Sequence, residues 1–90
     1  MKRNYRQLER IVRGFSNHRR IEIMKLLERM PEFSVSEVAQ ELKINFKTAA
    51  DHVRRLAIAG LVMKRSEGAS VRHRLTNTGI LILMFLRTLE

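Results

Sequence analysis

Arginine and lysine side chains supply the most obvious chemistry in this sequence. Residues 46–74 carry seven of them against two acidic side chains, whereas residues 21–45 carry three against five. Guanidinium and ammonium groups bind phosphate oxygens, and both can donate hydrogen bonds to the O6 and N7 atoms of guanine. The whole chain has 18 Lys and Arg, 9 Asp and Glu and a formal net charge of +9. Such a balance favours a polyanionic partner, above all nucleic acid.

A helix is needed to hold the central cations in a fixed pattern, and the sequence predicts one over residues 45–59. Asn45 is a favourable N-cap residue, and apolar side chains recur at helical spacing from Ala49 to Val53 and Leu56. At about 100° per residue, the opposite side of this helix is polar. In the major groove of a duplex, that side would present four candidates for contacts with base edges: Lys47, Ala50, Asp51 and Arg54.

The residues after this helix change to a period of two. This pattern predicts two strands, 61–66 and 69–75, around the turn Glu67-Gly68, and arginines alternate with apolar residues in the second strand. The resulting hairpin has one basic face. Together with the flank of the preceding helix it supplies six candidates for phosphate contacts: Thr48, Arg55, Lys64, Arg65, Arg72 and Arg74.

Three further helices are predicted earlier in the chain, over residues 5–15, 17–30 and 34–42. The third opens on Ser34 and Glu37, whose spacing is that of a capping box. A break of about three residues separates this helix from the cationic one. Two helices joined by so short a turn form a helix-turn-helix, and the hairpin that follows is its wing.

The last predicted helix follows Thr76 and is apolar on every side from Ile80 to Leu86. A small domain cannot cover both faces of such a helix, which predicts a homodimer. The candidates for the dimer interface come from the first and last helices: Tyr5, Leu8, Val12, Ile80, Leu83, Met84 and Phe85. For the three residues of the first helix, packing within the single chain is an equal alternative.

These elements predict a mainly α fold with a small β-hairpin. We expect one winged helix-turn-helix domain over residues 1–90, with five helices and a two-stranded wing, because 90 residues leave room for one core. The longest apolar run has seven residues, where a membrane span needs about 20. With no signal-peptide pattern at the start, this favours a cytoplasmic protein without a membrane partner.

Catalytic and cofactor chemistry find no support in the residue types. The chain has no cysteine, no paired carboxylates, no Ser-His-Asp set and no glycine-rich phosphate loop, and Gly68 and Gly79 are placed in turns. We therefore expect no enzyme activity and no cofactor. His18, His52 and His73 lie at spacings that do not bring two of them to one helix face, so we expect no metal site.

The run VSEVAQELKINFKTAADHVRRLAIAGLVMKRSEGASVRHRLTNTG resembles the winged helix-turn-helix of ArsR-like transcriptional regulators. The resemblance extends back through NHRRIEIMKLL and covers roughly residues 17–79. Three segments carry it in combination: HRRIEIMKLL, DHVRRLAIAGLV at 51–62 and EGASVRHRLT at 67–76. The resemblance implies a DNA-binding fold. The family includes metal sensors, but none of their ligand positions carries over to this chain.

Three positions depart from the family pattern. Lys43 stands in the turn where glycine is common, so either the turn manages without a residue that adopts positive φ readily or Lys43 adopts a different turn. His73 stands where the wing often has tyrosine. Asp51 lies on the cationic helix, where it either accepts from a cytosine amino group or pairs with Arg54 or Arg55, and we favour the pair.

Two functions fit these observations. The first is a sequence-specific, double-stranded-DNA-binding transcriptional regulator, a homodimer that reads a pseudo-palindromic site with helix 45–59 in the major groove and the 61–75 wing on the phosphate backbone. The alternative is a protein-interaction module whose basic surface docks on an acidic partner. With no sensory domain and no ligand motif in the sequence, we expect neither a small-molecule nor a metal effector.

Overall fold

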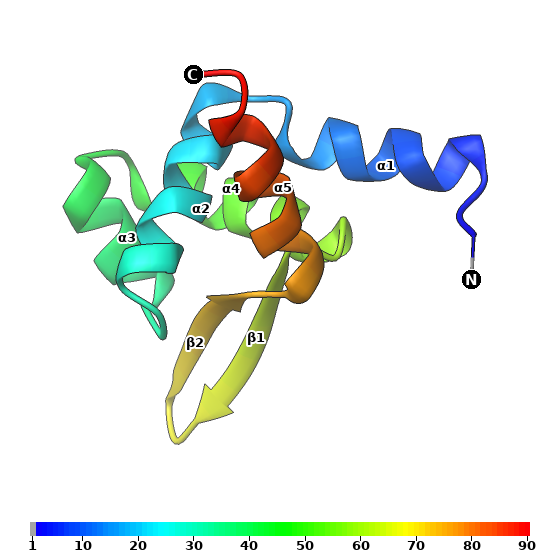
Figure 1. Cartoon of the computed structure of the whole chain (residues 1–90). Helices are drawn as coiled ribbons and strands as arrows, with labels where there is room; N and C mark the ends of the chain where they lie inside the picture. Colours follow the sequence, from blue (N-terminus) through cyan, green and yellow to red (C-terminus); the bar gives the residue numbers. More distant parts are fainter. Residues whose placement is uncertain (1) are drawn as a thin grey trace.

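The computed structural model describes residues 2–90, which form five helices and one antiparallel hairpin (Figure 1). The predicted fold class and order of elements are confirmed. The elements in chain order are α1 (Tyr5–Phe15), α2 (His18–Arg29), α3 (Val35–Leu42), α4 (Phe46–Ile58), β1 (Val62–Glu67), β2 (Ser70–Leu75) and α5 (Asn77–Arg87).

Each helix begins at a polar side chain that accepts a hydrogen bond from the first turn. The predicted capping box of α3 is present, with Glu37 N donating to Ser34 Oγ at 3.2 Å and Ser34 N donating to Glu37 Oε1 at 2.8 Å. Asn45 caps α4 by accepting from Lys47 N, and Thr76 caps α5 by accepting from Gly79 N. These caps satisfy N–H groups that a helix leaves unpaired, and they fix where each helix starts.

The turn between α3 and α4 is closed by Lys43 in the left-handed conformation, with φ 56° and ψ 47°. Lys43 N and Ile44 N donate back to carbonyls in the last turn of α3. A non-glycine residue in this conformation costs about 1 kcal/mol, so the turn is made without glycine at a moderate energetic penalty. This tight turn sets α4 across α3.

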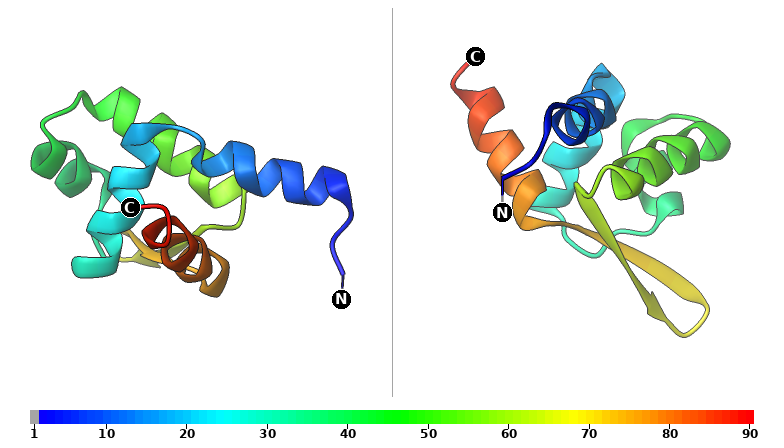
Figure 2. Two further views of the ribbon diagram at one scale, coloured as in Figure 1. Left: turned by 45° about the horizontal axis from the view of Figure 1, so that its top comes forward. Right: turned by 90° about the vertical axis from the view of Figure 1, so that its right-hand side faces the viewer.

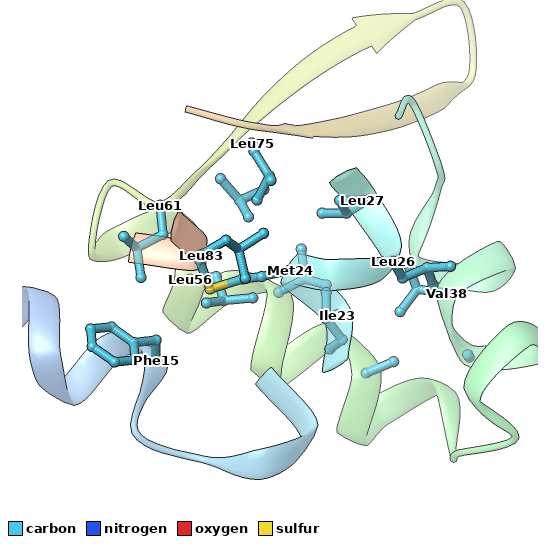
Figure 3. Packing of buried hydrophobic residues seen from close by; sticks show 14 residues of the cluster. Phe15, Ile23, Met24, Leu26, Leu27, Val38, Leu56, Leu61, Leu75 and Leu83 are labelled. Carbon is cyan, nitrogen blue, oxygen red and sulfur yellow. The ribbon is translucent and has the colours of Figure 1, made fainter. Parts of the chain in front are cut away.

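One hydrophobic core joins the helices and the base of the hairpin (Figure 3). Ala49, Val53 and Leu56 anchor α4 in this core, as its apolar spacing predicts. Leu83 lies in the same cluster and has no exposed surface. Its predicted place in a dimer interface is therefore wrong, because a side chain that is fully covered within one chain has no surface left for a partner.

The hairpin projects from the body (Figure 2), and an isolated antiparallel bridge between Phe33 and His73 ties it to the segment before α3. The strands pair from Val62 with Leu75 out to Glu67 with Ser70. The predicted turn is wrong by one residue: the two-residue loop is Gly68-Ala69, with Gly68 at a φ of 60°. Positive φ at the first loop residue suits a type II′ turn, which follows the twist of the strands.

The position of Gly79 also differs from the predicted one. It lies in the first turn of α5 and is buried, whereas the sequence placed it in a turn. A Cβ atom at Gly79 would collide with the backbone oxygen of Leu61. The position therefore lacks a side chain because the start of α5 packs directly on the chain that enters β1.

Helices α1 and α5 leave apolar side chains uncovered. Helix α1 extends sideways from the body, and Tyr5 at its start is 90% exposed (Figures 1 and 2). On α5, Met84 and Phe85 are each 54% exposed. Within residues 2–90, no helix combines the length and apolar character that crossing a bilayer requires.

Candidate nucleic-acid interface

Helix α4 presents a polar face opposite the side that it buries. Lys47, Thr48 and Arg54 are exposed, while Ala50 and Asp51 are partly exposed. Lys47 has no ion-pair partner among residues 2–90. The predicted orientation of the helix is confirmed, and it places the four candidates for base contacts on one accessible surface.

Asp51 organises the two arginines that follow it on α4. Arg54 Nη2 donates to Asp51 Oδ1 at 2.6 Å, and Arg55 Nε donates to Asp51 Oδ2 at 3.0 Å. The hydrogen bonds from Arg55 and Arg54 lower the pKa of the Asp51 carboxyl below its ordinary value. The predicted intrahelical pair is confirmed in the free chain. A guanidinium has five N–H donors, so each arginine keeps others that can reach a ligand.

Arg65 and Arg74 of the wing pair with Glu32, which precedes α3, and Arg65 also pairs with Glu67 of its own strand. Arg65 Nη2 lies 3.0 Å from Glu32 Oε2 and 2.9 Å from Glu67 Oε2, and the glutamates raise the pKa of Arg65 above its ordinary value. Arg74 lies 4.0 Å from Glu32. Of the wing cations in the described chain, Lys64 alone has no ion pair.

Arg72 joins the wing to the start of α3. Its Nη1 atom donates to the backbone oxygen of Glu32 at 3.2 Å and to Glu37 Oε1 at 3.3 Å. The pKa of Glu37 is lowered, first by the Ser34 backbone and side-chain hydrogen bonds and then by the charge of Arg72. In the free chain Arg72 is therefore a structural anchor, and its contact with phosphate stays a prediction.

His73 completes this junction from the inner face of the wing. It is 2% exposed, its Nδ1 lies 2.9 Å from the backbone oxygen of Phe33, and its backbone N donates to the same oxygen at 3.0 Å. Glu32 N donates to the His73 oxygen at 2.9 Å. The wing is thus fixed relative to the helix-turn-helix by backbone bonds as well as ion pairs.

The sequence of the helix-turn-helix and of the start of its wing matches a known family. The family described as "Bacterial regulatory protein, arsR family" matches residues 17–64, more than half of the chain. The chain belongs to the arsR family of bacterial regulatory proteins.

Solved structures agree with this assignment. Mb0332 from Mycobacterium bovis, a homodimeric winged helix-turn-helix DNA-binding domain and a possible ArsR-family transcriptional regulator, is 26% identical with a TM-score of 0.80, over 99% of this chain and 87% of that one. HlyU from Vibrio cholerae is 27% identical with a TM-score of 0.81, over 99% and 97%. An ArsR-like transcriptional regulator from Rhodococcus sp. RHA1 is 28% identical with a TM-score of 0.76, over 94% and 77%. No curated protein sequence matches the chain.

In this arsR-family chain, sequence reasoning missed the glutamates that pair with the wing. Glu32 and Glu37 lie in the mildly acidic stretch 21–45, so their charge was visible. Glu32 lies 33 residues from its partner Arg65 in the sequence, and Glu37 lies 35 residues from Arg72. The spacing of residues along one element cannot reveal such pairs. The one signal in the sequence was the contrast between an acidic and a basic block, and it does not show which side chains pair.

Sequence reasoning also missed a third group of cations. Arg10 and Arg13 of α1 and Arg20 of α2 lie around the same hollow as Arg54 and Arg55 of α4. The three helices come together only in the folded chain. No cluster of three or more His, Asp or Glu side chains suited to a metal ion is found within residues 2–90.

The remaining candidates for a dimer interface lie on the surface of the arsR-family fold. Tyr5 and Val12 on α1 are exposed, as are Ile80, Met84 and Phe85 on α5, and Leu8 is 44% exposed. The alternative that the three α1 residues pack within the single chain is therefore wrong. Exposed apolar surface of this kind is typical of protein interaction sites.

Proposed function

We propose that this arsR-family chain is a sequence-specific, double-stranded-DNA-binding transcriptional regulator that acts as a homodimer. The observation that carries the proposal is the amphipathic construction of α4. Ala49, Val53 and Leu56 fasten one side to the core, while the opposite side offers Lys47 and Arg54 to solvent. A rigid helix with this polarity is suited to the major groove, where side chains can reach base edges.

The base-reading surface is assigned to four side chains of α4. Lys47 and Arg54 donate to guanine O6 and N7, and Ala50 touches a thymine methyl group. Asp51 holds the Arg54 side chain at 2.6 Å before DNA arrives. An arginine fixed by a neighbouring carboxylate loses less conformational freedom on binding, so Asp51 prepares Arg54 for a bidentate contact.

The phosphate contacts are assigned to the flank of α4 and to the wing. They fix the position of the protein on the duplex and contribute most of its salt dependence. Lys64 is available at once, whereas the wing arginines must share their donors between glutamates and phosphates. The proposed contacts are Thr48, Arg55, Lys64, Arg65, Arg72 and Arg74.

The homodimer is assigned to the exposed apolar faces of α1 and α5. Tyr5, Leu8 and Val12 on the first helix and Ile80, Met84 and Phe85 on the last supply this surface. The similar Mb0332 domain is described as homodimeric, which supports the assignment. A two-fold dimer reads a pseudo-palindrome whose half-sites lie about 10 base pairs apart, or a multiple of that spacing.

The deciding experiment is selection of bound sequences from a random duplex pool with the full chain. We expect a pseudo-palindromic consensus, and binding to it that weakens steeply as salt rises. A chain that retains no duplex at about 50 mM salt would contradict the proposal and favour the protein-interaction alternative. Enrichment of a single asymmetric motif would contradict the two-fold reading.

A further inference from the structure

A hollow of about 240 Å³ lies where α1, α2 and α4 meet. Five guanidinium side chains line it, and Ile58 and Ala59 form an apolar wall. We call this site the arginine hollow. Its cationic members are Arg10, Arg13, Arg20, Arg54 and Arg55.

The hollow is built by a close approach of α1 to the end of α4 (Figure 2). Gly14 makes this approach possible, since a Cβ atom there would collide with the Cβ of Ala59. With the helices so close, the last turns of α1 bring Arg10 and Arg13 beside the two arginines of α4. Arg20 reaches the same space from α2.

The positive charge around the hollow is only partly neutralised. Asp51 accepts from Arg54 and Arg55, and Glu9 lies 3.8 Å from Arg13. Within residues 2–90, Arg10 and Arg20 have no ion-pair partner. Five guanidinium groups therefore face two carboxylates, so the site carries an excess of three positive charges.

Arg20 carries a hydrogen-bond donor that the described part of the folded chain leaves unpaired. Its Nε atom is buried and has no hydrogen-bond partner in the described chain. A buried donor without a partner is unfavourable by roughly 1–3 kcal/mol. Arg20 also lines the hollow, so an oxyanion bound there would lie beside its guanidinium and beside the unpaired donors of its neighbours.

We propose that the arginine hollow binds a small organic anion that carries more than one phosphate charge. Guanidinium groups match the geometry of phosphate oxygens in pairs, and the excess of positive charge favours a multivalent anion over a monovalent one. The wall of Ile58 and Ala59 accommodates a short apolar portion of the ligand.

The ligand has a direct route to α4, because Arg54 and Arg55 line the hollow and also lie on the proposed recognition helix. An anion that draws these side chains inward withdraws donors from the duplex. Ligand and duplex therefore weaken each other's binding by the same factor. This coupling rests on the proposed function, whereas occupancy of the hollow does not.

The first arm of the test measures ligand binding without DNA. Pyrophosphate is titrated into the full chain by calorimetry and by NMR, with sodium chloride added to hold ionic strength constant. The variants are Arg10→Gln and Arg20→Gln. The controls are Arg6→Gln on α1 and Arg29→Gln on α2, which remove the same charge outside the hollow.

We expect both hollow variants to weaken pyrophosphate binding about tenfold or more, and both controls to change it less than about twofold. Circular dichroism of each variant verifies the fold. Because Arg10 is exposed, its variant decides the question even if Arg20→Gln perturbs packing. Equal losses in variants and controls, or no binding beyond that of chloride, overturn the proposal.

The second arm adds a selected duplex at fixed ionic strength. We expect saturating pyrophosphate to weaken duplex binding by the wild-type chain and not by Arg10→Gln. If Arg10→Gln weakens duplex binding while pyrophosphate fails to bind in the first arm, the hollow serves a DNA phosphate and the small-ligand proposal is wrong. If the chain binds pyrophosphate but no duplex, the proposed function fails while the ligand site stands.

Discussion

The wing and the arginine hollow are both rich in arginine, but the two regions treat that charge differently. In the wing, Glu32, Glu37 and Glu67 accept from or lie beside every arginine of the hairpin. In the hollow, Arg10 and Arg20 have no ion-pair partner within the described chain. Paired cations hold elements together, whereas unpaired cations keep their binding capacity for a ligand.

The comparison shows that a count of basic residues does not measure the charge available to a partner. The wing provides three arginines and one lysine in the sequence. In the fold only Lys64 among them lacks an ion pair within residues 2–90. Exposed ion pairs are weak and exchange with water, so phosphates can recruit the wing arginines, but only in competition with glutamates.

The largest effect is expected where the hollow depends on packing. Gly14→Ala places a methyl group against the Cβ of Ala59. Neither side chain can rotate to relieve this clash. We expect a loss of about 1–3 kcal/mol in the free energy of unfolding, measured by urea denaturation. The separation of α1 from α4 should also weaken pyrophosphate binding.

The matched control for this substitution is Arg6→Ala, on the same helix and outside the hollow. It lies on the surface and should change stability by less than about 0.5 kcal/mol. Unchanged stability in Gly14→Ala would mean that α1 is not held against α4, and the hollow would lose its structural basis.

Next in size is the effect of Arg54→Ala on base preference. Arg54 belongs to the recognition face and to the hollow. We expect a loss of about 1–3 kcal/mol of discrimination at one base pair of each half-site, measured by titration of single-base variants of the selected duplex. Arg72→Ala serves as the contrast, because losing a phosphate contact weakens binding to all sequences alike and lowers the salt slope by about one unit.

If Arg54→Ala leaves both affinity and preference unchanged, its assignment to the groove is wrong. If Arg72→Ala instead alters the far-ultraviolet circular dichroism or melting of the chain, its bonds to Glu32 and Glu37 outweigh any phosphate contact.

A smaller effect tests the paired state of the wing. Glu32→Gln removes the carboxylate that Arg65 and Arg74 share. We expect tighter duplex binding and a salt slope that is steeper by about one unit, since the freed arginines become available to phosphates. Glu41→Gln is the control, because it makes the same charge change at an exposed glutamate outside these pairs. Equal effects of the two substitutions would show that net charge alone is responsible.

The sequence predicted what local rules determine. Caps at Ser34 and Asn45 and the spacing of apolar residues gave the helices to within a residue or two, and also the outward face of α4. The wing turn was displaced by one residue, because Glu67 and Gly68 are both compatible with a hairpin loop. Gly79 resembled a turn residue, yet it is needed where Leu61 approaches the start of α5.

Contacts between distant elements were beyond the reach of these rules. Leu83 was assigned to an interface because an apolar helix shows no inner side until its neighbours are placed. The arginine hollow combines residues of three helices, so no window of sequence contains it. The expectation of no small-molecule effector rested on the absence of a local motif, and a site assembled by tertiary packing leaves no such motif.

The smallest expected effect is on the titration of His52, whose pKa depends on the charge of Arg20 in the hollow. Burial, followed by the charge of Arg20, lowers the pKa of His52 below its ordinary value of 6.5. The unfolded chain then binds a proton that the folded chain does not, so this histidine removes stability as pH falls from above 6.5 towards its folded pKa. His52→Gln should flatten that part of the stability profile, measured by urea denaturation at several pH values.

Substitutions at the two contrasted regions separate their effects on His52. Arg20→Gln removes the nearby positive charge, so we expect the pKa of His52, measured by NMR, to rise towards its ordinary value. Arg72→Gln removes an equal charge from the wing, where Glu37 already balances it, and should leave the His52 titration in place. An equal rise of the His52 pKa in both variants would mean that the two regions contribute to one diffuse electrostatic field at His52. If the pKa of His52 rises only in Arg20→Gln, the unbalanced charge lies in the hollow. Only a cation that is near His52 and weakly screened from it can shift this pKa.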